Sequence, residues 1–376
     1  MGRIAIRAAQ AGLTLIELMV SITIGLVVVG AMTYLYIGSK GAYRGNESLA
    51  RIQEAGRFAL DAITRDVRSA GVLGCGSSAS LTNGQAPNVN VVAPAGTAMN
   101  AAVLYVAPVT GQPVPIVGVR PAAYTPLPTA APGGWVPPPN PPAPTYWGGD
   151  VLQLQIATGV AVRMSGAPDL AGGKITIADN SVAAFKATDY ALLGDCSSAT
   201  VFQVNSVTAT APALLSYKTS GGVIPPLNAL GQPGFSIMTF PMVQHVDQVT
   251  YYVGKVPNSV SPQFPNGLSA LYRYSLSSNK AEELVENVED MDVLYGVGAG
   301  GAMAGGTFKR ADTMTAADWS NVISVRVSVV GVGDQLGAAP TPQTVQVHGA
   351  GSGWVVPETR LRQVFTATAA LRDRLQ

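Results

Sequence analysis

The run from Leu13 to Gly38 is almost wholly apolar, and Glu17 is its only ionisable side chain ahead of two tyrosines. A helix needs about 20 apolar residues to cross a bilayer, and this run provides about 25. Arg3 and Arg7 lie before it, so its N-terminal end is expected to stay in the cytoplasm and the rest of the chain to be exported. The pattern therefore predicts one transmembrane helix.

Glu17 lies where a carboxylate is costly, at roughly 2.5–3.5 kcal/mol on insertion scales. The chain therefore needs a partner for it, or a moment when it leaves lipid. Cleavage after Gly12 would create an α-amino group on Leu13, one helical turn from Glu17, as a counter-charge. An ordinary secretory signal has a shorter apolar region of about 7–15 residues. That alternative and a plain single-span anchor both leave the acid unexplained.

The helical pattern continues beyond the apolar run. Apolar positions recur at steps of three and four on one face, and charged residues occupy the other, spaced to pair along the helix. We predict one helix from about Leu13 to Ala70, with 13–40 as its transmembrane half and 41–71 as its amphipathic half. The apolar face comprises Leu49, Ile52, Gly56, Leu60, Ile63 and Val67, and the charged face Arg51, Glu54, Arg57, Asp61, Arg65 and Arg68.

Glycines interrupt the first half of this helix, and each costs about 1 kcal/mol in a helix interior. They are either places where the helix bends or melts, or places where another helix approaches closely. The sequence leaves both interpretations open for Gly25, Gly30, Gly38, Gly41 and Gly45.

Residues 72–376 have the pattern of a β-rich head, because short strands follow one another with turn signals between them. In the clearest, 322–330, apolar and polar residues alternate as in a half-buried antiparallel strand. The predicted fold class is α+β, a long N-terminal helix followed by a mainly antiparallel β head. Other candidate strands are 101–107, 150–157, 174–178, 200–207, 235–240, 248–253, 269–276, 292–297 and 363–371, with helical turns at 281–288 and 315–319.

Composition narrows the class of protein. Charged residues make up 12% and the net charge is +1, without a basic stripe, so nucleic-acid binding is poorly supported. The 42 glycines and 27 prolines fit an exported domain with many turns. The stretch 131–147 is too rich in proline for a central strand and is expected to form an exposed loop.

Two cysteines, Cys75 and Cys196, are expected to form a disulfide in an exported chain, with two unpaired buried thiols as the alternative. The bridge would close a loop of about 120 residues, worth nominally 4–5 kcal/mol in the chain-entropy description. Two cysteines and two histidines so far apart do not indicate a metal site.

The sequence gives no indication of an enzyme or of a cofactor. His245 and His348 are isolated along the chain, and the common catalytic motifs are absent. The acidic cluster at 282–290 is expected to be a solvated helix face. We expect Leu271, Tyr272 and Trp319 to pack in the core, and Arg273 and Arg326 to lie on solvated strand faces.

The N-terminal segment resembles the class III leader of type IV pilins and type II secretion pseudopilins. The matching residues are Gly12, Leu13 (where the family usually has Phe) and Glu17, after a short basic leader 1–12. The resemblance implies cleavage after Gly12 by a prepilin peptidase and N-methylation of Leu13. It also implies that Glu17 neutralises the N-terminus of a neighbouring subunit.

Segments of the head resemble the PilW type of minor pilin. They are Gly74-Cys75, Asp195-Cys196, Leu271-Tyr272-Arg273, 283–289, Tyr295-Gly296, Trp319 with the strand after it, and 364–372. The family often has an acidic loop after its Tyr-Gly, whereas 298–306 here is Gly-rich and uncharged, which argues against an ion site there.

This resemblance implies a minor pilin that primes type IV pilus assembly and sits at or near the pilus tip, supporting twitching motility and adhesion. Its expected partners are other minor pilins, the major pilin and a large tip adhesin. Before assembly it would cross the inner membrane once with its head in the periplasm, and afterwards it would be extracellular. The alternatives are a minor pseudopilin of type II secretion and an unprocessed membrane-anchored adhesion protein.

Overall fold

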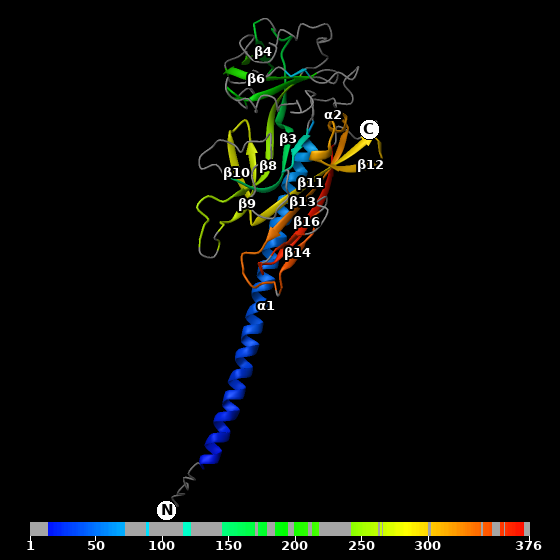
Figure 1. Cartoon of the computed structure of the whole chain (residues 1–376). Helices are drawn as coiled ribbons and strands as arrows, with labels where there is room; N and C mark the ends of the chain where they lie inside the picture. Colours follow the sequence, from blue (N-terminus) through cyan, green and yellow to red (C-terminus); the bar gives the residue numbers. More distant parts are fainter. Residues whose placement is uncertain are drawn as a thin grey trace, which may run out of the picture.

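A long helix leads into a head built of β-sheets, as Figure 1 shows for this computed structural model. The predicted α+β class is confirmed. The helix projects far from the head, and its first residue, Leu15, is at the end distant from the head. The structure describes residues 14–71, 88–89, 116–121, 145–169, 172–178, 185–194, 199–209, 213–217, 242–261, 264, 266–299, 302–339, 341–347, 354–356 and 358–371.

The helix α1 comprises Leu15–Ser69 and is unbroken, close to the predicted bounds. The side chain of Thr14 caps its start by accepting a hydrogen bond from the backbone N–H of Glu17. After the cap residue Ala70, Gly71 adopts a φ of 84°, which favours glycine and turns the chain away. A Cβ on any of the five glycines between positions 25 and 45 would meet no atom within 4 Å, so these glycines do not pack against the described head.

The larger sheet has ten strands, ordered β10-β9-β8-β5-β6-β7-β4, with β3 joining β8 to β2 and β1 joining β6. The long strands β3 and β8 pair along most of their length. The bounds are β1 Asn88–Val89, β2 Ile116–Val119, β3 Tyr146–Arg163, β4 Lys174–Ile177, β5 Tyr190–Gly194, β6 Ala199–Thr208, β7 Ala213–Tyr217, β8 Met242–Lys255, β9 Ser269–Ser275 and β10 Lys280–Glu286.

The second sheet has four antiparallel strands in the order β12-β11-β13-β16. A short 3-10 helix, η4, and the helix α2 connect β12 to β13, and α2 confirms the helical turn predicted at 315–319. The bounds are β11 Val288–Ala299, β12 Ala302–Arg310, η4 Ala311–Thr313, α2 Ala316–Ser320, β13 Val322–Val332, β14 Gln343–Val345, β15 Trp354–Val356 and β16 Arg362–Ala370, with β14 and β15 forming a separate pair.

The C-terminal half of α1 is held by its predicted apolar face. Ile52, Gly56, Ile63 and Val67 are buried, and Ile63 and Val67 belong to a core shared with both sheets. Gly56 lies directly against the ring of Phe365 on β16, and a Cβ there would overlap that ring. The absence of a side chain at Gly56 therefore allows β16 to approach the helix closely.

Gly56→Ala is expected to destabilise the head by about 1–3 kcal/mol, because the added methyl group overpacks the Phe365 contact. Gly45→Ala is the matched control. It gains helix propensity of about 1 kcal/mol and meets no neighbour. Urea unfolding of the head in detergent measures both changes, and equal stability of the two variants would contradict the packing argument.

The helical turn predicted at 281–288 is wrong, because this segment forms β10 and the start of β11. Asn279 and Asn287 have φ values of 50° and 60° and turn the chain at both ends of β10. Pairing with β9 overrides the helix propensity of Ala, Leu and Glu. The acidic cluster is therefore split between two strands, with Asp290 buried and Glu289 ion-paired to Arg362 at 2.6 Å.

Two predicted loops are partly strand. The proline-rich excursion stops before Tyr146 and Trp147, which begin β3 and are buried. Residues 298–299 and 302–306 belong to the hairpin of β11 and β12. The predicted strands 101–107 and 235–240, most of 131–147, both cysteines, His348, Gly12 and Leu13 lie outside the described residues.

The predicted strand at 322–330 is confirmed as β13, but it is buried on both faces instead of one. It lies between β11 and β16, and its polar face finds partners across the strands. Ser328 Oγ is 2.9 Å from Thr366 Oγ1, and the guanidinium of Arg326 lies 3.8 Å from the ring centroid of Phe308. Satisfied polar groups can be buried at little cost, so alternation alone did not predict the exposure.

Candidate assembly surfaces of the N-terminal helix

The first half of α1 does not pack against the described part of the head. Its large apolar side chains are exposed from Leu15 to Ile37, including Leu15 at 74% and Val27 at 72%. Within the described residues, α1 is long and apolar enough to cross a membrane, and none of that apolar window is buried. Such a surface requires lipid or other apolar helices around it.

Glu17 lies in the first turn of this exposed half. Thr14 Oγ1 is 3.5 Å from Glu17 Oε2, and Ser21 Oγ donates a 2.7 Å hydrogen bond to the Glu17 carbonyl. Both contacts are local to the helix end. The Glu17 carboxylate makes no ion pair within the described residues, and it therefore remains open to a cation outside them.

The second half of α1 is fixed to the larger sheet by a partly buried polar cluster. Asp66 on α1 accepts hydrogen bonds from Tyr251 Oη at 2.7 Å and from Arg273 Nε at 2.9 Å. Burial and the Asp66 carboxylate raise the pKa of Tyr251. Burial alone would lower the pKa of Arg273, but the same carboxylate raises it. The expectation that Arg273 lies on a solvated face is therefore wrong, because this side chain fixes the helix to β9.

A second polar cluster is fully buried between the sheets. Arg120, just after β2, is 3.1 Å from Asp150 on β3 and 2.8 Å from Asp292 on β11 through the same nitrogen. Asp150 also accepts the backbone N–H of Val293 at 2.8 Å. Burial raises the pKa of Asp150 well above its usual value, despite Arg120. One guanidinium between two carboxylates thus links strands of different sheets.

The raised pKa of Asp150 predicts a pH dependence of stability. In the unfolded chain an Asp loses its proton near about pH 3.9, whereas the folded head keeps the Asp150 proton to higher pH. Stability should therefore fall as pH rises from that value through the folded pKa, and then level off. Asp150→Asn removes this titration, so chemical unfolding from pH 4 to 9 should show a shallower decline than in the parent. Parallel pH profiles would contradict the prediction.

His245 is isolated in sequence but not in the fold. Its Nδ1 is 2.7 Å from Thr158 Oγ1, and its Nε2 is 3.3 Å from Asp189 Oδ2. Thr158 and Ala191 are its direct cross-strand neighbours on β3 and β5, so strand register explains this chain of contacts. Within the described residues, no group of three or more His, Cys, Asp or Glu side chains is arranged to hold a metal.

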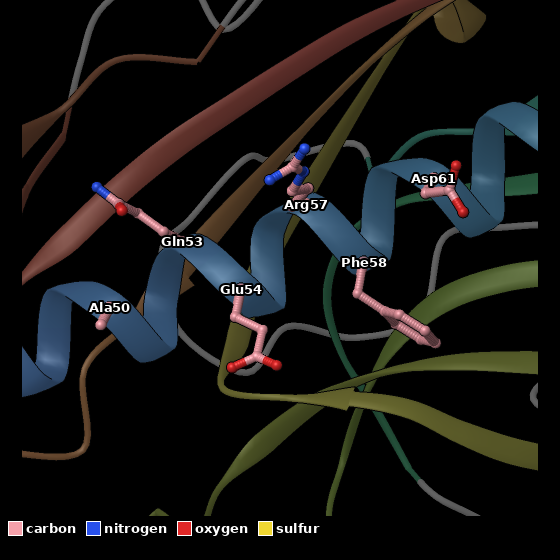
Figure 2. A pocket seen from close by; sticks show the side chains of 6 residues that line it. All are labelled: Ala50, Gln53, Glu54, Arg57, Phe58 and Asp61. Atoms are coloured by element: carbon pink, nitrogen blue, oxygen red, sulfur yellow. The ribbon is translucent and has the colours of Figure 1, made fainter.

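The outward face of α1 borders a hollow of about 630 Å³ (Figure 2). Glu54 and Phe58 project from one side of the helix, and Gln53 and Arg57 from the other. Phe58 is 55% exposed, although most large apolar side chains of this half are covered. The described lining is Ala50, Gln53, Glu54, Arg57, Phe58 and Asp61.

The chain matches two protein-family models, one near its N-terminus and one over its C-terminal third. Residues 7–33 match the prokaryotic N-terminal methylation motif, which spans Gly12, Leu13 and Glu17. Residues 250–373 match the type IV pilus-assembly protein W family, PilW, from the end of β8 through β16. Together these matches support a type IV pilin-like minor pilin. No curated protein and no solved structure matches it significantly.

The head of this minor pilin shows which interactions the sequence alone missed. The matched region contains Tyr251, Arg273 and Asp292, whereas their partners Asp66, Arg120 and Asp150 lie before it. Charged residues inside otherwise apolar strands were the available signal for both clusters. The predicted core positions Leu271, Tyr272 and Trp319 are confirmed as buried.

Proposed function

We propose that this minor pilin primes type IV pilus assembly and is incorporated at or near the tip, where it supports twitching motility and adhesion. The observation that carries the proposal is the division of α1 into an unpacked apolar half and a half locked to the head. A helix of this kind moves from lipid into a helical bundle, while the head remains a fixed unit outside the membrane.

The processing steps belong to the same proposal. Cleavage after Gly12 and N-methylation of Leu13 would place the new N-terminus one turn from Glu17, within the matched methylation motif. Thr14 caps the helix immediately after that site. The Glu17 carboxylate of one subunit then pairs with the Leu13 amine of a neighbour. The proposed Cys75–Cys196 disulfide would clamp the head after export.

Localisation and partners follow from this proposal. The pilin waits in the inner membrane with its head in the periplasm, is processed by the prepilin peptidase, and then joins other minor pilins and the major pilin on the way to the cell exterior. A large tip adhesin is a further proposed partner. We assign the head a structural role without catalysis, since strand register accounts for the His245 contacts.

Two measurements test the proposal. Intact-mass analysis of the membrane-extracted chain should give a mature protein that starts at methylated Leu13, and a chain that still starts at Met1 would overturn processing. Immunogold labelling of sheared pili should place the head at filament ends. Labelling confined to the cell envelope, in cells whose secretion system depends on the protein, would indicate a pseudopilin instead.

A further inference from the structure

The charged face of α1 has a repeating pattern that breaks at one position. Acids recur every seven residues at Glu47, Glu54 and Asp61. Four residues after the first and the last acid lies an arginine, and both pairs form, Arg51–Glu47 at 2.8 Å and Arg65–Asp61 at 2.6 Å. Four residues after Glu54 lies Phe58 instead.

The break leaves two complementary features together. Within the described residues the Glu54 carboxylate has no cation within 4 Å, since neighbouring Arg57 projects from the other side of the helix (Figure 2). Phe58 exposes its ring beside Glu54, on the same side. Both residues line the 630 Å³ hollow. A single exposed Phe is ordinary, but here the exposed Phe also replaces the partner of a carboxylate and borders a hollow, and these are features of an interface anchor.

The chemistry of this pair selects its ligand. A carboxylate beside an aromatic face suits a guanidinium, which can bond the acid through its edge and stack on the ring through its plane. Among the described residues of the head, guanidinium groups stack in this way on Phe rings, with Arg326 over Phe308 at 3.8 Å and Arg360 over Phe264 at 4.3 Å from the ring centroids. The compact ammonium group of a lysine can also pair with the Glu54 carboxylate and lie over the Phe58 ring.

We propose that Glu54 and Phe58 form a docking site for a basic side chain of a neighbouring pilin subunit, carried on the membrane-distal half of its first helix. The proposal rests on the proposed function. Any pilin that covers the apolar half of α1 runs alongside it, and Phe58 lies only about 30 Å further along the helix than Ile37. The site would thus fix the register of the two subunits outside the membrane, separately from Glu17.

The test uses the full chain in piliated cells, with photoreactive p-benzoylphenylalanine at position 58. The same group at Ile24 reports general helix packing, and at Arg65, one heptad beyond Phe58, it reports the ordinary charged face. Position 58 should give an adduct whose cross-linked peptide, read by mass spectrometry, comes from a pilin and holds an Arg or Lys within one turn. Adducts at Ile24 but not at 58, or a peptide without a base, would overturn the docking site and leave the proposed function standing. Adducts at no position would count against the proposed function itself.

Charge reversal makes the test specific. Glu54→Arg should lower the position-58 adduct by about tenfold or more, as for loss of an interface anchor. Replacing the identified base of the partner by Glu should restore it. Phe58→Arg, which rebuilds the intrahelical pair with Glu54, should remove the adduct that the parent gives when the photoreactive group is moved to Ala50, which also lines the hollow. Glu47→Gln is the control, because it breaks the Arg51 pair without touching the hollow. An adduct unchanged by Glu54→Arg would overturn the proposal.

Discussion

Glu17→Ala is expected to leave the minor pilin in the membrane and to reduce its amount in sheared pili more than a hundredfold. In the filament the variant would leave the Leu13 amine of a neighbour without its counter-charge, and removing one partner of a buried ion pair costs about 3–5 kcal/mol. Insertion should not suffer, because the substitution removes a charge from an apolar run. Quantitative immunoblots of the membrane and pilus fractions measure both effects.

Two controls separate charge from local structure. Ser21→Ala removes a hydrogen bond to the Glu17 carbonyl and should assemble normally. Glu17→Gln keeps the shape of the side chain and the Thr14 cap, but should assemble as poorly as the alanine variant. Wild-type amounts of the alanine variant in pili would refute the counter-charge mechanism.

Arg120→Met should destabilise the head by about 3–5 kcal/mol, because it leaves Asp150 and Asp292 buried without the guanidinium between them. The loss should shrink at low pH, where the carboxylates can take up protons. The triple replacement of Arg120, Asp150 and Asp292 by apolar residues of similar volume should recover most of the stability, as for other buried ion clusters.

The measurement is denaturant unfolding of the detergent-solubilised protein, followed by the near-ultraviolet signal of its tryptophans. Arg310→Met is the matched control, since Arg310 pairs with Asp312 at the surface, where an ion pair contributes about 0–1 kcal/mol. An Arg120 variant no less stable than this control would show that the cluster does not join the sheets.

Much of the fold could be predicted from the sequence because local patterns determine it. In the second half of α1 the apolar positions keep a helical spacing, and a run long enough to cross a bilayer precedes them. These two patterns predicted both the bounds of the helix and its buried face. Eight of the sixteen described strands, including the long β3, β8, β11 and β13, were placed because β-branched residues alternate between turn signals. The segment 281–288 was not, because its composition favours a helix and only its pairing with β9 makes it a strand.

Long-range polar contacts could not be predicted in this way. Asp66 and Arg273, or Arg120 and Asp292, are brought together by strand order, which no local pattern encodes. Glu17 was found as a candidate because the free-energy cost of its carboxylate in a membrane follows from the apolar residues next to it in the sequence. Phe58 was not found as a candidate, since it stands out only when the ion pairs before and after it on the helix are known to form.

The close approach of Phe365 to Gly56 makes the last strand along the chain a neighbour of the first helix. During synthesis the apolar stripe of α1 emerges early, but the surface that covers it includes β16, which is made after every other strand. Until export is complete that stripe must be shielded by something else, such as lipid or a chaperone. A translation arrest shortly before β16 should therefore leave a chain anchored in the membrane and open to proteases along α1.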